Sequence, residues 1–185
     1  MARKLAVLAS GTGSLFAAMV EQGIPIALMV ADRECRALEI AKESKIPHFL
    51  KPRTFDKTFD RRRYTEDMLT LFREHNIDLV AMAGFMTVFD KLMFAKDAYQ
   101  LKILNTHPSL LPAFKGDHAV RDAIAYGVKI SGCTIHWATE ELDAGPILLQ
   151  EPVCVLSSDS VESLHERIKK VERQLYPKLL REFTT

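Results

Sequence analysis

The chain has 185 residues, of which 48% are apolar and 26% are charged, and its formal net charge is +1. A chain of this size and apolar content buries a core without disulfides or metal ions, which argues against intrinsic disorder. The balanced charge provides no overall field that would attract nucleic acid or anionic lipid. The apolar run at residues 5–9 is too short for an export signal or a membrane span.

Short apolar runs alternate with amphipathic segments in the first part of the chain. Strands are predicted for residues 4–9, 24–31, 47–50, 78–83 and 102–104, and helices for residues 14–22, 36–45 and 60–75. Continuous apolar runs are typical of strands that are covered on both faces, as in a parallel sheet. The alternation predicts a Rossmann-like α/β fold, in which helices flank a mostly parallel, twisted sheet.

The pattern changes in the last third of the chain. Residues 129–138 and 146–156 are predicted strands with no helix between them, which favours antiparallel pairing. A last helix is predicted to begin near Asp159, because Asp159 and Glu162 have the spacing of a capping box. Pro177 is expected to kink or interrupt this helix.

The cysteines and the basic residues exclude several classes of site. Cys35, Cys133 and Cys154 form no C-x-x-C pair, and no histidine has zinc-ligand spacing to them, so no metal site is predicted. Free thiols are expected, as in a reducing cytoplasm. The basic run at residues 61–63 has acidic residues on both sides, which favours a solvated helix face over a nucleic-acid patch.

A glycine-containing turn at residues 10–14 (SGTGS) follows the first predicted strand and opens the first helix. Backbone N–H groups at such a position can hold a phosphate, although a tight turn capped by Ser14 explains the same residues. Asp32, at the end of the second strand, would suit a dinucleotide site, but Phe16 stands where that motif has its third glycine. A lone phosphate is the better interpretation.

Asn105 and His107 stand just after the predicted strand 102–104, where ligands bind in open α/β sheets. In an extended chain they share one face, about 7 Å apart, and can converge on one reacting group. An amide donor beside an imidazole suits stabilisation of an oxyanion and proton transfer. Taken alone, the two residues also fit a polar strand end that caps backbone groups.

The turn before Gly145 supplies a carboxylate that could orient His107 and favour its charged form. Asp143 is the candidate, but Glu140 and Glu141 lie close enough in the sequence to substitute for it. Spacing alone does not choose among the three carboxylates.

Two other positions have ordinary structural explanations. His136 could face the same pocket, or it could be a hydrogen-bonded core histidine. Lys169 and Glu172 lie three residues apart on the last predicted helix, which fits a solvated pair as well as a site.

Three blocks of residues together resemble the folate-dependent phosphoribosylglycinamide formyltransferases of purine biosynthesis. Residues 105–112, with Gly116 and His118, are similar to the family's N-x-H-P-S-L-L-P-x-x-x-G-x-H signature. Residues 141–147 are similar to its E-L-D-x-G-P-I/V loop, and residues 83–86 to its A-G-F-M strand end. The resemblance implies one formyltransferase domain over residues 1–185, with a phosphate-binding half to about residue 100 and a catalytic, folate-binding half after it.

The resemblance also implies the reaction. The formyl group of 10-formyltetrahydrofolate, a co-substrate, passes to the amine of 5'-phosphoribosylglycinamide without a metal. Asn105, His107 and Asp143 are implied as the catalytic residues. The enzyme is expected to be a cytoplasmic monomer or homodimer that binds neither nucleic acid nor membrane.

Two sets of binding residues follow from the resemblance. Those implied for the glycinamide ribonucleotide are Gly11, Thr12, Gly13, Ser14, Leu15 and Glu172. Those implied for the folate are Arg61 (or its neighbours Arg62 and Arg63), Met86, Thr87, Val88, Phe89, Asn105, Glu140 and Glu141. The family commonly has Asn at positions 12 and 15 and Arg at 87, so this chain is expected to lose a side-chain contact at Leu15.

Other activities fit parts of the sequence. Formyltetrahydrofolate deformylases share the three catalytic residue types but carry an N-terminal regulatory domain, for which the strand predicted from residue 4 leaves no space. Methionyl-tRNA formyltransferases need a further C-terminal domain, which is not expected here. A non-catalytic module for phosphate ligands would explain the glycine turn but would leave Asn105, His107 and Asp143 without a role.

Overall fold

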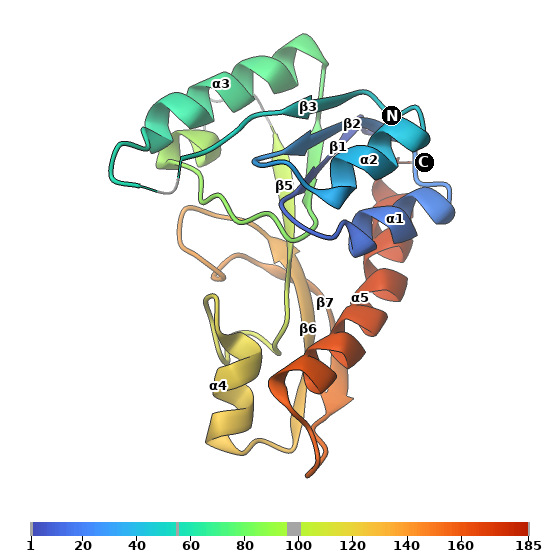
Figure 1. Cartoon of the computed structure of the whole chain (residues 1–185), viewed down its shortest axis with the longest axis vertical. Coiled ribbons are helices and arrows are strands. Elements are labelled where there is room, and N and C mark those ends of the chain that lie inside the picture. Colours follow the sequence, from blue (N-terminus) through green and yellow to red (C-terminus); the bar gives the residue numbers. More distant parts are fainter. Residues whose placement is uncertain (1, 55, 96–100, 185) are drawn as a thin grey trace.

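The computed structural model describes residues 2–54, 56–95 and 101–184 (Figure 1). The strands are β1 (Leu5–Ala9), β2 (Ile26–Ala31), β3 (His48–Leu50), β4 (Leu79–Met82), β5 (Lys102–His107), β6 (Ile130–Trp137) and β7 (Ile147–Cys154). The helices are α1 (Ser14–Glu21), α2 (Arg36–Glu43), α3 (Arg61–Glu74), the short 3-10 helix η1 (Lys91–Phe94), α4 (Ala119–Tyr126) and α5 (Val161–Thr184).

The seven strands form a sheet in the order β3-β2-β1-β4-β5-β6-β7. The first five strands in that order pair in parallel, whereas β6 is antiparallel to both β5 and β7. The predicted fold class, a mostly parallel sheet with antiparallel strands in the last third of the chain, is confirmed.

Alternate residues of β1 face two separate cores. Val7 packs on the side of the sheet that is covered by α1, α2 and α5, whereas Leu8 packs on the side that is covered by α3 (Figure 1). Both side chains are fully buried, as are the other residues of this strand. A strand with helices on both faces needs an unbroken apolar sequence, which is why these strands are recognisable from composition alone.

The start of α5 is capped one residue later than the sequence predicts. The Ser160 N–H donates to the Ser163 hydroxyl over 3.0 Å, and the Ser163 N–H donates to the Ser160 hydroxyl over 3.2 Å. Asp159 instead accepts from the Leu156 N–H at 2.8 Å. The capping box predicted for Asp159 and Glu162 is therefore wrong, because a reciprocal pair of serines satisfies the first turn.

The interruption expected at Pro177 is also wrong, because α5 continues to Thr184. A proline has no N–H, so the carbonyl of Arg173, four residues earlier, lacks its helical donor. Gln22, at the end of α1, supplies that donor: its side-chain Nε2 lies 2.9 Å from the Arg173 carbonyl oxygen. The Gln22 carbonyl in turn accepts from Arg181 at 3.0 Å. A contact between distant segments thus lets the helix pass through its proline.

The sequence did not predict α4 and η1, and it ended β5 too early. The polar residues Asn105, Thr106 and His107 continue β5 because they pair with β6 opposite His136, Ile135 and Thr134. Pairing with a neighbouring strand, and not apolar composition, extends the strand as far as the site described below.

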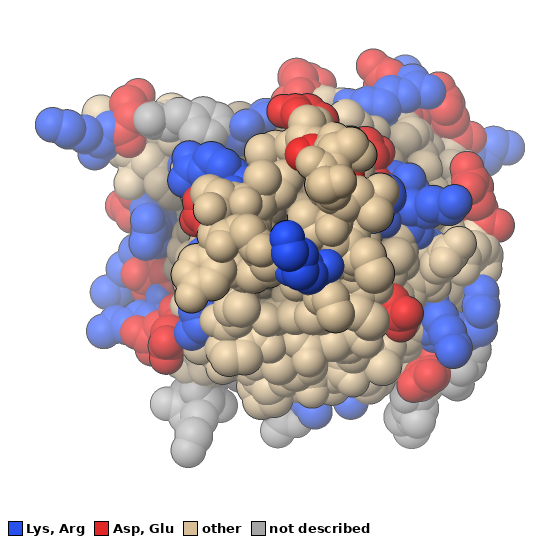
Figure 2. Space-filling view, turned by 90° about the horizontal axis from the view of Figure 1, so that it is seen from below, with Lys and Arg blue, Asp and Glu red and all other residues tan. Residues whose placement is uncertain are grey.

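Charged side chains of both signs are interspersed at the margins of the molecule, and the end seen from below is mostly uncharged (Figure 2). In the basic run on α3, Arg62 pairs with Glu66 at 3.1 Å and Arg63 with Asp67 at 3.7 Å. These pairs fit a solvated helix face. Within the described residues, no helix is both long and apolar enough to cross a membrane.

Candidate active site

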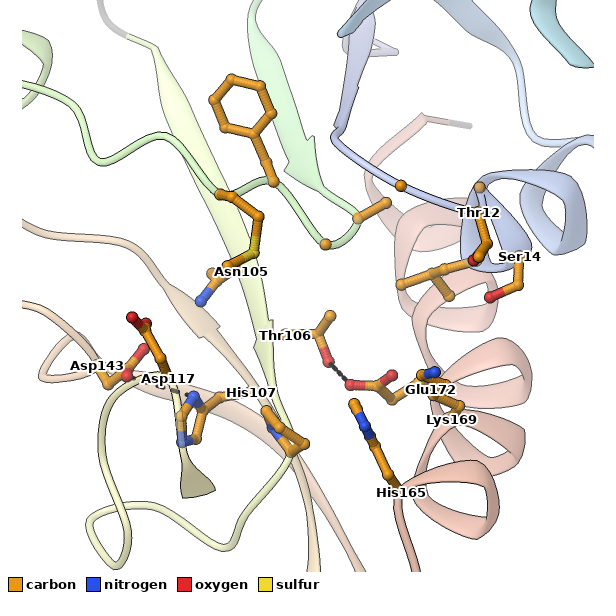
Figure 3. A pocket seen from close by; sticks show the side chains of 18 of the residues that line it. Thr12, Ser14, Asn105, Thr106, His107, Asp117, Asp143, His165, Lys169 and Glu172 are labelled. Carbon is orange, nitrogen blue, oxygen red and sulfur yellow. Dashed lines mark hydrogen bonds and ion pairs between the residues drawn. The ribbon is translucent and has the colours of Figure 1, made fainter. Parts of the chain in front are cut away.

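A pocket of about 410 Å³ lies where β1, β4 and β5 end, with the inner face of α5 as one wall (Figure 3). The carboxyl ends of parallel strands are the usual place for ligands in this class of fold. The predicted site residues that line the pocket are Gly11, Thr12, Gly13, Ser14, Leu15, Met86, Val88, Asn105, His107, Asp143 and Glu172.

The other residues predicted to bind folate, Arg61, Thr87, Phe89, Glu140 and Glu141, are not among those that line the pocket. Thr87 and Phe89 belong to the segment that follows β4, and their side chains are buried. Glu141 points to Lys115, 3.4 Å away. These five assignments stay predictions, and none of the five residues lines the pocket.

The end of β5 presents its residues alternately to two sides of the pocket. Asn105 and His107 share one face, as the sequence predicts. Both lie on the same side of the pocket as the turn that carries Asp143 (Figure 3). Thr106 points the other way and donates its hydroxyl hydrogen to Glu172 on α5 over 2.8 Å. One short strand thus divides the pocket into a side with an imidazole and an amide, and a side with a buried carboxylate.

The ring of His107 lies between two acceptors. Its Nε2 is 2.7 Å from the carbonyl oxygen of Phe114, and its Nδ1 is 3.3 Å from Oδ2 of Asp143. A carbonyl can only accept, so Nε2 must carry a hydrogen. Nδ1 is therefore the nitrogen that faces the carboxylate, and it carries a hydrogen only when the ring is charged.

Of the three carboxylates that the sequence leaves open, Asp143 is the one whose side chain lies in the pocket beside His107. Its backbone adopts a left-handed conformation with φ of 51°, which turns the side chain inward. The Gly116 N–H donates to Oδ2 over 2.9 Å. Burial raises the pKa of Asp143, but the contact with His136, the Gly116 hydrogen bond and the neighbouring imidazoles outweigh it, so this pKa lies below its usual range.

His136, for which the sequence allows two interpretations, does not line the pocket but contacts Asn105 and Asp143, which do. Its Nδ1 donates to the Trp137 carbonyl oxygen over 3.0 Å, and its Nε2 lies 3.3 Å from Nδ2 of Asn105. A neutral ring accepts the Asn105 amide hydrogen and so fixes the orientation of that amide. A charged ring would instead donate toward Asp143, whose Oδ1 is 3.6 Å away.

The inner face of α5 carries His165, Lys169 and Glu172, which all line the pocket (Figure 3). Glu172 is only 8% exposed, so its interpretation as a solvated partner of Lys169 is wrong. Burial raises the pKa of Glu172, against the hydrogen bond from Thr106 and the charge of Lys169. The Lys169 ammonium instead pairs with Glu166 at 2.9 Å.

His165 was not predicted as a pocket residue. Burial lowers the pKa of its imidazole, and the nearby charge of Lys169 lowers it further. The signal that could have found it is its position: His165, Lys169 and Glu172 have the i, i+4, i+7 spacing that places residues on one face of a helix.

The glycine turn opens α1 as predicted, but Ser14 does not cap the helix. The N-cap residue is Gly13, whose φ is 70°, and no side chain of the described residues caps the first turn. A Cβ at position 13 would lie 2.9 Å from the Cα of Ala37, so this glycine is required by close packing against α2 as well as by its φ. A Cβ at position 11 would meet no atom of the described residues within 4 Å, and this side of the turn is open to the pocket.

The dinucleotide interpretation is excluded by the surroundings of Asp32. Its side chain is fully buried, pairs with Arg33 at 3.0 Å and accepts from the Thr87 hydroxyl at 2.7 Å. A carboxylate enclosed in this way cannot receive the hydroxyls of a ribose. Phe16, at the place of the motif's third glycine, is fully buried in the core.

In the part of the chain that the structure describes, no three His, Cys, Asp or Glu side chains are grouped so that they could hold a metal ion. Cys35, Cys133 and Cys154 are free thiols.

Comparison with known proteins connects this site to a family. Residues 3–180 match the family model described as formyl transferase. Phosphoribosylglycinamide formyltransferase of Mycobacterium tuberculosis (strain ATCC 25618 / H37Rv) is 44% identical over 177 residues, which cover 93% of this chain and 80% of that protein. The enzyme of the same name from Bacillus subtilis (strain 168) is 35% identical over 188 residues, which cover 97% of this chain and 94% of that protein.

A solved structure gives the same result for the fold. The crystal structure of phosphoribosylglycinamide formyltransferase from Streptococcus pneumoniae TIGR4 superposes with a TM-score of 0.89 at 34% sequence identity, over 99% of both chains. The family model spans nearly the whole chain, and the two bacterial relatives named above match it over most of their own length. On this evidence the chain belongs to the formyl transferase family and, within it, to the phosphoribosylglycinamide formyltransferases.

Proposed function

We propose that the protein transfers the formyl group of 10-formyltetrahydrofolate to the amine of 5'-phosphoribosylglycinamide, which yields formylglycinamide ribonucleotide and tetrahydrofolate. The observation that carries the proposal is the composition of one pocket. It joins a glycine turn at the start of α1 to the group formed by Asn105, His107 and Asp143. A phosphate-bearing acceptor and a formyl donor can therefore meet in one enclosed space.

The chemistry requires an amine to attack the formyl carbon. As the new C–N bond forms, the carbonyl oxygen takes up the electron pair of the C=O double bond, and this oxyanion needs hydrogen-bond donors. The Asn105 amide and the charged His107 ring can supply them from one face of β5. Collapse of the tetrahedral intermediate breaks the bond to the folate nitrogen, which must receive a proton as the amine loses one.

His107 and Asp143 can carry this proton. Because Nε2 of His107 is engaged by the Phe114 carbonyl, we assign the proton transfer to Nδ1, beside Asp143. The carboxylate stabilises positive charge on the ring while Nδ1 holds the proton, and the ring is neutral once the proton has passed to the folate nitrogen. His136 holds the Asn105 amide in place and takes no proton in this scheme.

The ribonucleotide is proposed to lie along α5. Its phosphate would bind the open side of the turn at residues 11–14, where the N-terminal N–H groups of α1 favour an anion. The buried carboxylate of Glu172 would bind the other end of the substrate, near the amine. Thr106 holds that carboxylate from β5, within one residue of both Asn105 and His107.

The folate is proposed to lie across the exposed side chains of Met86, Val88 and Leu142, which form the apolar lip of the pocket. Apolar surface of this kind suits a flat aromatic ring system. Backbone groups of residues 140–143 would bind the polar edge of that ring. The position of Asp143 at the end of this loop supports a placement of the formyl carbon next to His107.

One assay tests the proposed function. The protein is incubated with 10-formyltetrahydrofolate, with and without glycinamide ribonucleotide, and release of tetrahydrofolate is followed. Turnover that depends on the ribonucleotide is expected. Equal release in its absence would identify a deformylase, and binding of the folate without any release would identify a non-catalytic module.

The open side of the glycine turn gives a sharper test of the phosphate site. Gly11→Val is expected to weaken ribonucleotide binding at least about tenfold, because its side chain enters the open space that the phosphate needs. Folate affinity and thermal stability should stay near those of the unmodified protein. Calorimetric titration of each ligand measures the difference.

Gly13→Val is the matched comparison. It should lower stability and affect both ligands, because its side chain would clash with the backbone of α2. If Gly11→Val left ribonucleotide affinity unchanged, the phosphate would have to bind elsewhere.

The remaining predictions about the enzyme form part of the same proposal. Residues 1–185 are proposed to act as one formyltransferase domain, for which the continuous sheet from β3 to β7 is the support. We also propose that the protein functions in the cytoplasm as a monomer or homodimer and binds neither nucleic acid nor membrane. The free thiols and the balanced charge support this proposal.

A further inference from the structure

A row of polar residues lies under the segment that follows β4, outside the pocket. Asp32 follows β2 and Ser10 follows β1, while Thr87 belongs to the segment after β4. In the sheet β1 lies between β2 and β4, so these residues lie side by side at the carboxyl edge. The catalytic scheme above uses none of them.

The contacts in this row connect Asp32 to the folate side of the pocket. The Thr87 hydroxyl donates to Oδ2 of Asp32 over 2.7 Å, and both side chains are at most 1% exposed. The Ser10 hydroxyl accepts from the Met86 N–H at 2.8 Å, and the Ser10 N–H donates to the Gly84 carbonyl oxygen over 3.2 Å. Residues of this row thus contact the segment at three positions, Gly84, Met86 and Thr87.

The segment alternates in the direction of its side chains. Met86 and Val88 are 53% and 46% exposed and line the pocket, whereas Thr87 between them points to Asp32. Anchoring the middle residue inward is what turns its two neighbours outward. Without this anchor the segment would keep its contacts with Ser10 and Arg53 but would lose the contact that fixes its middle residue.

Asp32 is suited to this task by its charge. Burial raises the pKa of Asp32, but hydrogen bonds from Arg33, Thr87 and Ser10 outweigh it, so the pKa lies below its usual range. The carboxyl group is therefore ionised, and a hydrogen bond to an ionised acceptor is shorter and stronger than one between neutral groups. The Arg33 guanidinium balances the buried charge from the solvent side.

We propose that Asp32 is a positioning residue for the folate co-substrate, which acts through Thr87 by holding residues 86–88 in the conformation that presents Met86 and Val88 to the pocket. The inference rests on the proposed function, because it takes this segment as the folate-binding wall. Asp32 touches no substrate. Its effect is confined to folate affinity, since the ribonucleotide binds to α1 and α5 in the proposed site.

The experiment measures kcat and the two KM values for four variants. Thr87→Val keeps the volume and removes the hydroxyl, and Asp32→Ala removes the acceptor. Both are expected to raise the KM for 10-formyltetrahydrofolate about tenfold, as for loss of a hydrogen bond to a charged group. The KM for the ribonucleotide and the kcat at saturation should stay within about twofold of the values for the unmodified protein, because neither side chain contacts a ligand.

Two conservative variants and one control complete the set. Thr87→Ser keeps the hydroxyl and is expected to restore most of the folate affinity, whereas Asp32→Asn keeps an acceptor oxygen without the charge and is expected to restore only part of it. Thr184→Val removes another buried hydroxyl, which donates to the Leu180 carbonyl oxygen at the end of α5. It should change neither KM, and it controls for the general cost of losing such a group.

The outcomes separate this inference from the proposed function. A folate KM that is unchanged in Thr87→Val, or a parallel rise of both KM values, overturns the role of Asp32. A protein without ribonucleotide-dependent turnover overturns the proposed function instead. In that case calorimetric titration with tetrahydrofolate still decides the matter: weaker binding by Thr87→Val than by Thr87→Ser supports the anchor, and equal or undetectable binding overturns it.

Discussion

His107→Ala is expected to lower kcat by about a hundredfold or more, the effect of removing one oxyanion donor. The same substitution also removes the group that exchanges a proton with the folate nitrogen. Asp143 would lose its ionic partner at 3.3 Å, and the Phe114 carbonyl would lose its donor. Single-turnover rates at saturating substrates isolate the chemical step from binding.

The expected result requires that the fold survive, so thermal unfolding is measured in parallel. His48→Ala is the matched control, because His48 is an exposed histidine on the edge strand β3. It should retain full activity. Near-normal turnover by His107→Ala in a folded protein would remove this residue from the mechanism.

Asp143→Asn is expected to reduce turnover by about a hundredfold, because an amide cannot support a charged imidazole. The substitution keeps the size of the side chain. It also replaces one of the two acceptor oxygens by an NH2 group, so a single oxygen remains for the Gly116 N–H and the two histidines. Steady-state rates of the two proteins, compared over a range of pH, measure the loss.

The pH dependence of this effect follows from the sign of the pKa shift. Because the pKa of Asp143 in the folded protein lies below its usual range, the carboxylate stays charged through the neutral and mildly acidic range. Its contribution is lost only as the pH falls through that depressed value. The carboxylate of Asp143 should therefore add no pH dependence of its own to the wild-type rate between about pH 5 and 8.

Asp122→Asn, on the exposed part of α4, is the control for loss of one negative charge. It should leave the rate unchanged at every pH. A full loss of activity in Glu141→Gln, together with an active Asp143→Asn, would contradict the assignment and return the role to the other carboxylate of the turn.

The predictable parts of the fold are those in which the polarity of the local sequence matches the surroundings of the same residues in the folded protein. Residues 5–9 and 26–31 are apolar because helices cover both faces of the sheet, so composition was sufficient. The end of β5 and the passage of α5 through Pro177 were not predictable, because each depends on a partner far away in the chain. For Pro177 that partner is Gln22, on another helix.

The candidate site shows the same division. Two-residue alternation along a strand was enough to place Asn105 and His107 on one face. No spacing rule could show that the Phe114 carbonyl occupies Nε2 of His107, or that His136 reaches Asn105 from the next strand. Thr87 was misleading because it lies between two pocket residues in the sequence while its side chain points to Asp32.

The link between Gln22 and α5 has a consequence for which substrates the protein can accept. Helix α1 begins at the glycine turn and is fastened to α5 at its other end, next to Glu172, through the Arg173 carbonyl. A helix has a fixed rise per residue, so α1 holds the two ends of the proposed ribonucleotide site at a fixed distance from each other. In the proposed site, a phosphorylated amine much shorter or longer than the ribonucleotide would therefore reach only one of the two ends.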